Sequence, residues 1–134
     1  MFGTSWACPP AVGSVEHCRE RCGVYENVFV FTSLSKLKEK YDMNEWLEAL
    51  LRHEGITEKV VEIFRSEFDK ILILSTEGCT VCKKCAYPKE CRFPDRMFPA
   101  VESFGILVDQ SADNCGLSYC NGKNTITYFS MTFF

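Results

Sequence analysis

Four cysteines lie within thirteen residues of this chain, and no other feature limits its possible structure as strongly. They are Cys79, Cys82, Cys85 and Cys91. Each two-residue gap turns the backbone and returns the next sulfur to the same side, so that one loop can surround a soft metal centre. The chain has 134 residues and nine cysteines, and none of these lies between Gly23 and Gly78. We therefore expect the middle of the chain to form the core and the cysteines to lie around it.

The start of the chain has no basic stretch followed by an apolar one, so we expect no signal peptide. No apolar run approaches the ~18 residues of a membrane span. A cytoplasmic protein without membrane association is therefore expected, in which cysteines serve more often as metal ligands or redox groups than as disulfides. The net charge of −3 argues against a nucleic-acid-binding protein, which would usually be strongly basic.

The spacing of the run favours iron–sulfur ligation. Three cysteines at consecutive two-residue gaps, followed by a fourth, resemble the bacterial ferredoxin pattern C-x2-C-x2-C-x3-C-P. Here the last gap has five residues, and the proline is Pro94 rather than the residue directly after Cys91. We predict an iron–sulfur cluster, of the [4Fe–4S] type, at this run. In ferredoxins the fourth cysteine of such a run often serves a second cluster, so the spacing alone leaves open whether Cys91 joins the same centre.

Zinc is the main alternative. A four-cysteine Zn²⁺ site normally has two C-x2-C pairs separated by a longer loop, and these overlapping pairs fit that geometry less well. Thiol–disulfide exchange within one pair, or cysteines that bind nothing, are the other interpretations. His17 and His53 are the only histidines, so a mixed Cys/His site has few candidate ligands.

The residues around the run are basic. Between Cys79 and Arg96 there are five basic and two acidic residues, a net charge of +3 in a chain whose total charge is −3. Such surroundings stabilise a metal–thiolate centre, whose own charge is negative, without selecting the metal. For any single lysine the alternative interpretation is a solvated basic loop.

Ser14 as a cap and Gly23 just past the end predict a short helix over residues 14–21. Apolar side chains at helical spacing, each set preceded by a capping residue, predict helices over residues 42–54 and 57–68. Gly55 is expected to separate the last two. Short further helices are predicted after Pro99, ending at Gly105, and from Asp109.

Strands are predicted over residues 28–32, 71–74, 106–108 and 125–134. The first two are joined through helices, which suggests that they pair in parallel through a right-handed crossover. The last strand is strongly apolar, and an edge position for it would allow pairing with a second copy, so a homo-oligomer is one expectation.

Together these elements predict a small single α/β domain over residues 1–134. It would have one mostly buried sheet of three to four strands, with helices packed on it. A cysteine-rich metal-binding loop would follow a central strand.

Three segments carry a family resemblance. They are Trp6-Ala7-Cys8-Pro9-Pro10, the cysteine run with Tyr87-Pro88 and Cys91-Arg92-Phe93-Pro94, and Cys120-Asn121-Gly122. Through them the chain resembles, over nearly its whole length, a family of small cysteine-rich predicted metal-binding proteins of bacteria and archaea, domain of unknown function 2284. The resemblance implies metal binding by an iron–sulfur cluster and no established reaction. It implies that the ligands are Cys79, Cys82, Cys85 and Cys91.

The N-terminal segment differs from the family pattern. Members usually have further residues, including cysteines, ahead of the segment that looks like Phe2 to Pro10. We therefore expect the N-terminus to be truncated relative to the family. Cys8 is an additional candidate ligand, because Pro9 and Pro10 restrict its backbone.

The remaining cysteines, Cys18, Cys22, Cys115 and Cys120, are expected to be reduced packing residues. No Ser–His–Asp arrangement and no glycine-rich phosphate loop is visible, so the sequence assigns no enzyme activity. The predicted function is electron transfer or redox sensing with a protein redox partner. The alternatives are a structural zinc module that contacts another protein, and an enzyme whose cluster activates an unknown substrate.

Overall fold

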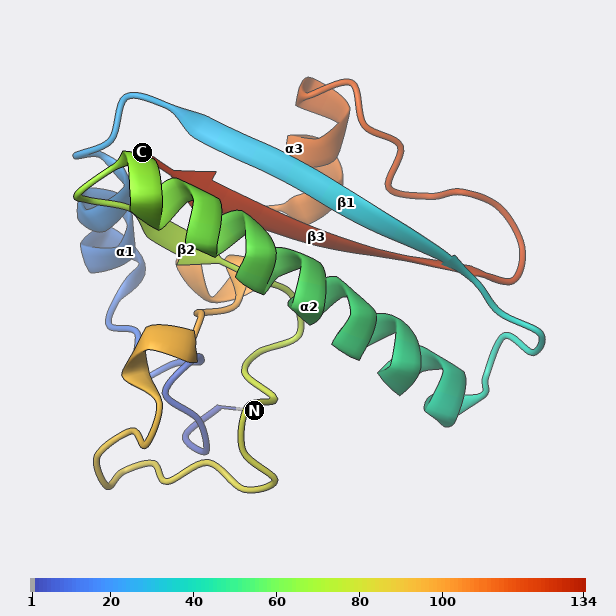
Figure 1. Ribbon diagram of the computed structural model, residues 1–134, viewed down its shortest axis with the longest axis horizontal. Helices are drawn as coiled ribbons and strands as arrows, with labels where there is room; N and C mark the ends of the chain where they lie inside the picture. The colour runs from blue at the N-terminus through green and yellow to red at the C-terminus, as the bar shows by residue number, and fades with distance from the viewer. Residues whose placement is uncertain (1) are drawn as a thin grey trace.

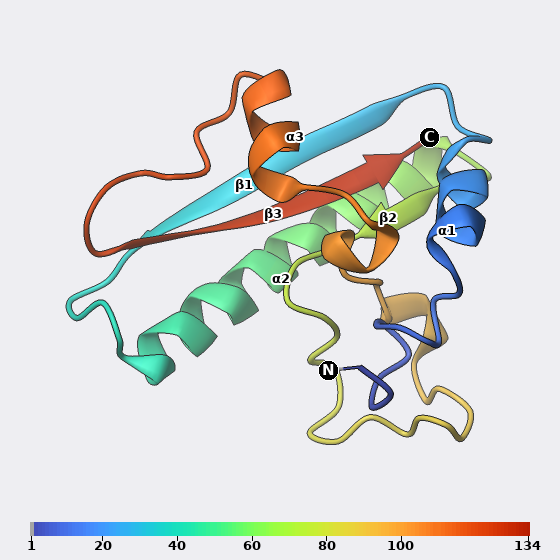
Figure 2. The ribbon, with the colours of Figure 1, turned by 180° about the vertical axis from the view of Figure 1, so that it is seen from behind.

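A computed structural model describes residues 2–134 and shows a three-stranded sheet with helices on both faces (Figures 1 and 2). The strands are β1 (Val28–Lys36), β2 (Leu72–Leu74) and β3 (Thr125–Phe133). The order is β1-β3-β2, and β3 pairs antiparallel with both neighbours. The predicted fold class, a small mixed α/β fold with one sheet, is confirmed.

Strand β3 forms the centre of the molecule because both of its faces are covered. Phe129 and Met131 belong to the apolar core on one face. On the other face, Tyr128 and Ser130 hydrogen-bond to residues of the long helix α2 (Met43–Glu67). Side chains of β3 therefore alternate between two faces, which pack against two different layers.

Two predictions about strand pairing are wrong. The strands at residues 28–32 and 71–74 are not neighbours, because β3 lies between them. For the same reason β3 is not an edge strand and cannot offer its backbone to a second copy. The strand pairing depends on β3, which is long and is buried on both faces. The residues that bury it are distant in the sequence.

Helix α2 is continuous through Gly55, so the two predicted helices are one. Asp42 caps its N-terminus as expected, accepting hydrogen bonds from the backbone of Asn44 and Glu45. Thr57 does not cap a new helix; its hydroxyl donates to the carbonyl oxygen of His53 one turn earlier. Burial of one helical stripe against the sheet outweighs the cost of an internal glycine, about 1 kcal/mol.

The continuous helix makes Gly55 a site for stabilisation. Replacement of Gly55 by alanine should raise the free energy of unfolding by about 1 kcal/mol, because an added Cβ would have no neighbour within 4 Å. Urea unfolding measures the change. Gly105→Ala is the matched control and should destabilise the protein, since Gly105 has φ +71° and its added Cβ would lie 3.2 Å from Val15. Equal effects of the two substitutions would contradict this prediction.

Shorter elements complete the opposite face and the end of the molecule. Ser14 caps α1 (Val15–Cys22), as predicted. Beyond the cysteines lie the 3-10 helices η1 (Pro94–Arg96) and η2 (Val101–Phe104), followed by α3 (Val108–Asn114). The strand predicted at residues 106–108 is wrong, because Val108 starts α3 and packs into the core. Within residues 2–134, no helix is long and apolar enough to cross a membrane.

Candidate metal centre

The cysteine loop, defined here as residues 79–93, has no helix or strand and starts close after β2 at the edge of the sheet. It lies at one end of the molecule beside the N-terminal segment in both views (Figures 1 and 2). The prediction that this loop follows a central strand is wrong, because β2 is an edge strand of the sheet. The edge position leaves room for a long irregular connection.

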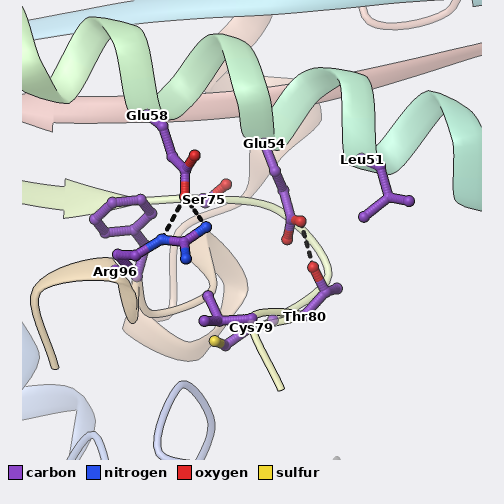
Figure 3. A pocket seen from close by; sticks show the side chains of 10 residues that line it. Leu51, Glu54, Glu58, Ser75, Cys79, Thr80 and Arg96 are labelled. Atoms are coloured by element: carbon purple, nitrogen blue, oxygen red, sulfur yellow. Dashed lines mark hydrogen bonds and ion pairs between the residues drawn. The ribbon is translucent and has the colours of Figure 1, made fainter. Parts of the chain in front are cut away.

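One flank of α2 holds the residues at both ends of the loop (Figure 3). At the start, the Thr80 hydroxyl donates a hydrogen bond to the Glu54 carboxylate. After the end, the Arg96 guanidinium donates from Nε at 2.8 Å to Oε1 of Glu58 and lies 2.6 Å from the same oxygen through Nη2. Arg65 also donates to the backbone carbonyl of residue 95 at 2.7 Å. Helix α2 therefore anchors the irregular segment that contains the cysteines.

The N-terminal segment supports the middle of the loop. The Trp6 indole N–H donates to the carbonyl oxygen of Lys89 at 2.9 Å. Its ring also meets that of Tyr87 edge-on, with 5.2 Å between the centroids. Two segments that are more than eighty residues apart are thus held together by one aromatic side chain.

All four cysteines of the run line one small cavity of about 20 Å³. Each is half-buried. The other walls are mainly apolar and come from the same segment: Val81, Ala86, Phe93 and Met97. The structure therefore brings together the four residues that the spacing predicted as ligands.

The four thiols are not arranged as a metal-ligand set in this structure. No group of three or more His, Cys, Asp or Glu side chains within residues 2–134 is placed so that it could hold a metal ion as it stands. The donor chemistry nevertheless fits a soft metal, because four thiols and no carboxylate line the cavity. Metal binding would therefore require the sulfurs to converge and lose their protons, which the irregular loop allows.

Hydrogen bonds favour the thiolate form of one cysteine. Burial alone would raise the pKa of the Cys85 thiol, but surrounding donors outweigh it and the pKa is lowered. These donors are the backbone N–H groups of Tyr87, Trp6 and Ala86 and the hydroxyl of Ser5. Such donors around sulfur are the usual outer contacts of metal–thiolate centres.

At Cys79 the balance is reversed. Burial raises the pKa of its thiol, the Val81 backbone N–H opposes this, and the negative charges of Glu54, Cys91 and Cys82 raise it further. These three charges disfavour the thiolate form of Cys79 by repulsion. A bound cation would remove that repulsion.

Figure 3 shows a second cavity, of about 180 Å³. It shares Cys79 and Val81 with the first. Glu54, Glu58 and Arg96 line it, and Ser75 is buried in its wall. Burial raises the pKa of the Glu54 carboxyl, although the bond from Thr80 partly opposes this. Cys79 lines both cavities.

The comparison with protein families agrees with this donor set. A family model described as predicted metal-binding protein (DUF2284) matches residues 1–134. The chain belongs to this family. Membership supports metal binding by a cysteine-rich protein and specifies neither the metal nor a reaction. Searches of curated proteins and of solved structures found no match to the chain.

The five other cysteines lie outside the cavity of the run. Cys8 is buried and lines a different cavity, together with Glu77 and Glu102. Cys18 is fully buried in the core and Cys22 packs against it, as expected. Cys115 and Cys120 are exposed, so the expectation that they are packing residues is wrong. Both lie on the irregular connection around Gly116, where few apolar groups cover them.

The sequence did not indicate the role of the α2 flank. Glu54 and Glu58 are four residues apart and therefore lie on the same face of a helix. The sequence predicted two helices separated at Gly55, which put Glu54 and Glu58 on different helices. Arg96, treated only as one base in a basic loop, is the partner of Glu58. A prediction of one continuous helix would have placed Glu54 and Glu58 on the same helix face.

Proposed function

We propose that the chain binds one [4Fe–4S] cluster through Cys79, Cys82, Cys85 and Cys91 and works in electron transfer or redox sensing. The observation that carries the proposal is the single cavity lined by all four cysteines. Their ferredoxin-like spacing and the positive charge of the segment support it. A bound cluster of this type supplies one-electron chemistry.

The chain's own residues would set the properties of such a centre. The donors around Cys85 would stabilise charge on its sulfur, and the apolar walls would limit access of water. The hydrogen bonds that Glu54 and Glu58 accept, and the one that Arg65 donates, would hold the ends of the loop while the sulfurs converge. All nine cysteines are free, which suits a reducing compartment such as the cytoplasm.

A structural zinc module is the second candidate, favoured by the size of the cavity. At about 20 Å³ the space would have to widen to accept several iron and sulfide ions, whereas one Zn²⁺ requires only that the sulfurs converge. A cluster-dependent enzyme is the third candidate. The cavity of about 180 Å³ beside Cys79 would give a small substrate access to the centre.

Anaerobic purification followed by metal analysis tests the proposal. We expect iron and sulfide together with a broad visible absorption that bleaches on reduction with dithionite. A colourless protein that retains one zinc per chain would overturn it and establish the zinc alternative. Substrate turnover that depends on the cluster would establish the third candidate.

A further inference from the structure

The outer surface of the cysteine loop carries unneutralised positive charge. Lys83, Lys84, Lys89 and Arg92, called here the basic collar, are all exposed. Within residues 2–134 none of them forms an ion pair, whereas Arg96 is neutralised by Glu58. The Arg92 guanidinium donates to the carbonyl oxygen of Lys84 at 3.1 Å, which joins the two parts of the collar.

An exposed aromatic side chain lies next to this collar. Phe93 follows Arg92, lines the cavity of the four cysteines and is still 45% exposed. Lys83 and Lys84 occupy the gap between Cys82 and Cys85, two other residues of the same cavity. An apolar contact beside charged groups is the usual composition of a protein–protein interface, with a dry centre and a polar rim.

The charge distribution indicates what kind of partner fits. Residues 79–96 have a net charge of +3, so the remainder of the chain carries −6. A long polyanion such as nucleic acid would extend beyond the collar onto an acidic surface. A compact acidic protein would contact the collar alone, and attraction there would orient it over the cavity.

We propose that the basic collar and Phe93 form the docking surface for an acidic electron-transfer protein. This inference rests on the proposed iron–sulfur function. One electron would pass from the reduced partner to the centre, so that the partner is oxidised and the centre reduced by one electron, with no atom exchanged. Docking at the collar would bring the partner close to Cys82 and Cys85, whose intervening residues supply two of its charges.

Titration calorimetry with an acidic plant-type [2Fe–2S] ferredoxin as the probe tests this surface. We expect the affinity to fall at least about tenfold between about 20 and 200 mM salt. The double substitution Lys83→Glu, Lys84→Glu should weaken binding by about tenfold or more, because it places like charges against the probe. Lys123→Glu is the matched control: it makes the same kind of charge change per residue on the exposed connection before β3 and should have little effect.

The metal content and visible spectrum of each preparation separate this inference from the proposed function. Protein that contains iron but does not bind the probe would overturn the docking surface alone. The docking surface would also be overturned if the substitutions at Lys83 and Lys84 left the affinity for the probe unchanged. The same holds if Lys123→Glu weakened the affinity equally. Protein without iron would overturn the function, whatever its affinity for the probe. If the Lys83→Glu, Lys84→Glu variant is purified without metal, the Lys89→Glu variant is used instead for the same binding measurement.

Discussion

Replacement of Cys82 by serine is expected to reduce the metal content of purified protein at least about tenfold. A serine hydroxyl stays protonated at neutral pH, so one of the four ligands that line the cavity would be lost. The fold should persist, because Cys82 is half-buried in the irregular loop and is not part of the apolar core. Metal analysis with far-ultraviolet circular dichroism separates loss of metal from loss of structure.

Two other cysteines give matched controls for this experiment. Cys115→Ser changes the same chemical group at an exposed position outside the cavity and should keep the metal content of the parent protein. Cys8→Ser should also keep it, because Cys8 lines a different cavity. If Cys82→Ser retained as much metal as the parent, Cys82 would not be a ligand. If Cys8→Ser lost it, the ligand set would extend to the N-terminal segment.

Local sequence signals predicted most elements of this fold because the physics that forms them is local. The caps at Ser14 and Asp42 each satisfy a free helix N-terminus within a few residues. The alternation along β3 is likewise a property of neighbouring residues. Strand order is different, because β3 becomes central only by pairing with β1 and β2, which lie far from it in the sequence. Val28 and Leu72 both pair with Phe133, one from each side.

The candidate site shows the same division. Spacing within thirteen residues was enough to predict that Cys79 and its three companions would share a cavity. The supports of that cavity come from elsewhere in the chain: Glu54 and Glu58 from α2, and Trp6 from the N-terminal segment. No pattern near the cysteines could indicate them, since a contact across many residues depends on the tertiary arrangement.

His53 is expected to make the protein sensitive to acid. Its ring is fully buried, with Nδ1 2.7 Å from the Ser33 hydroxyl and Nε2 2.8 Å from that of Ser130. Burial lowers the pKa of His53 from its ordinary 6.5 to about 4, a change that the Phe129 backbone only partly opposes. Between these two pH values the unfolded chain binds a proton that the folded protein does not. Stability must therefore fall as the pH decreases through this range, by a total on the order of 3 kcal/mol from this residue.

Urea unfolding of the parent protein and of His53→Gln between about pH 7 and pH 4 isolates this effect. At neutral pH the variant should be less stable by about 1–3 kcal/mol, because a buried hydrogen-bond partner is lost. The difference should shrink as the pH falls, since glutamine does not titrate. Groups common to both proteins, including Glu54 and the cysteine thiols, largely cancel in the comparison. His17→Gln is the control for the substitution itself, because that side chain is 58% exposed and its replacement should change the stability little. A difference between parent and His53→Gln that stayed constant with pH would show that His53 does not resist protonation in the folded state.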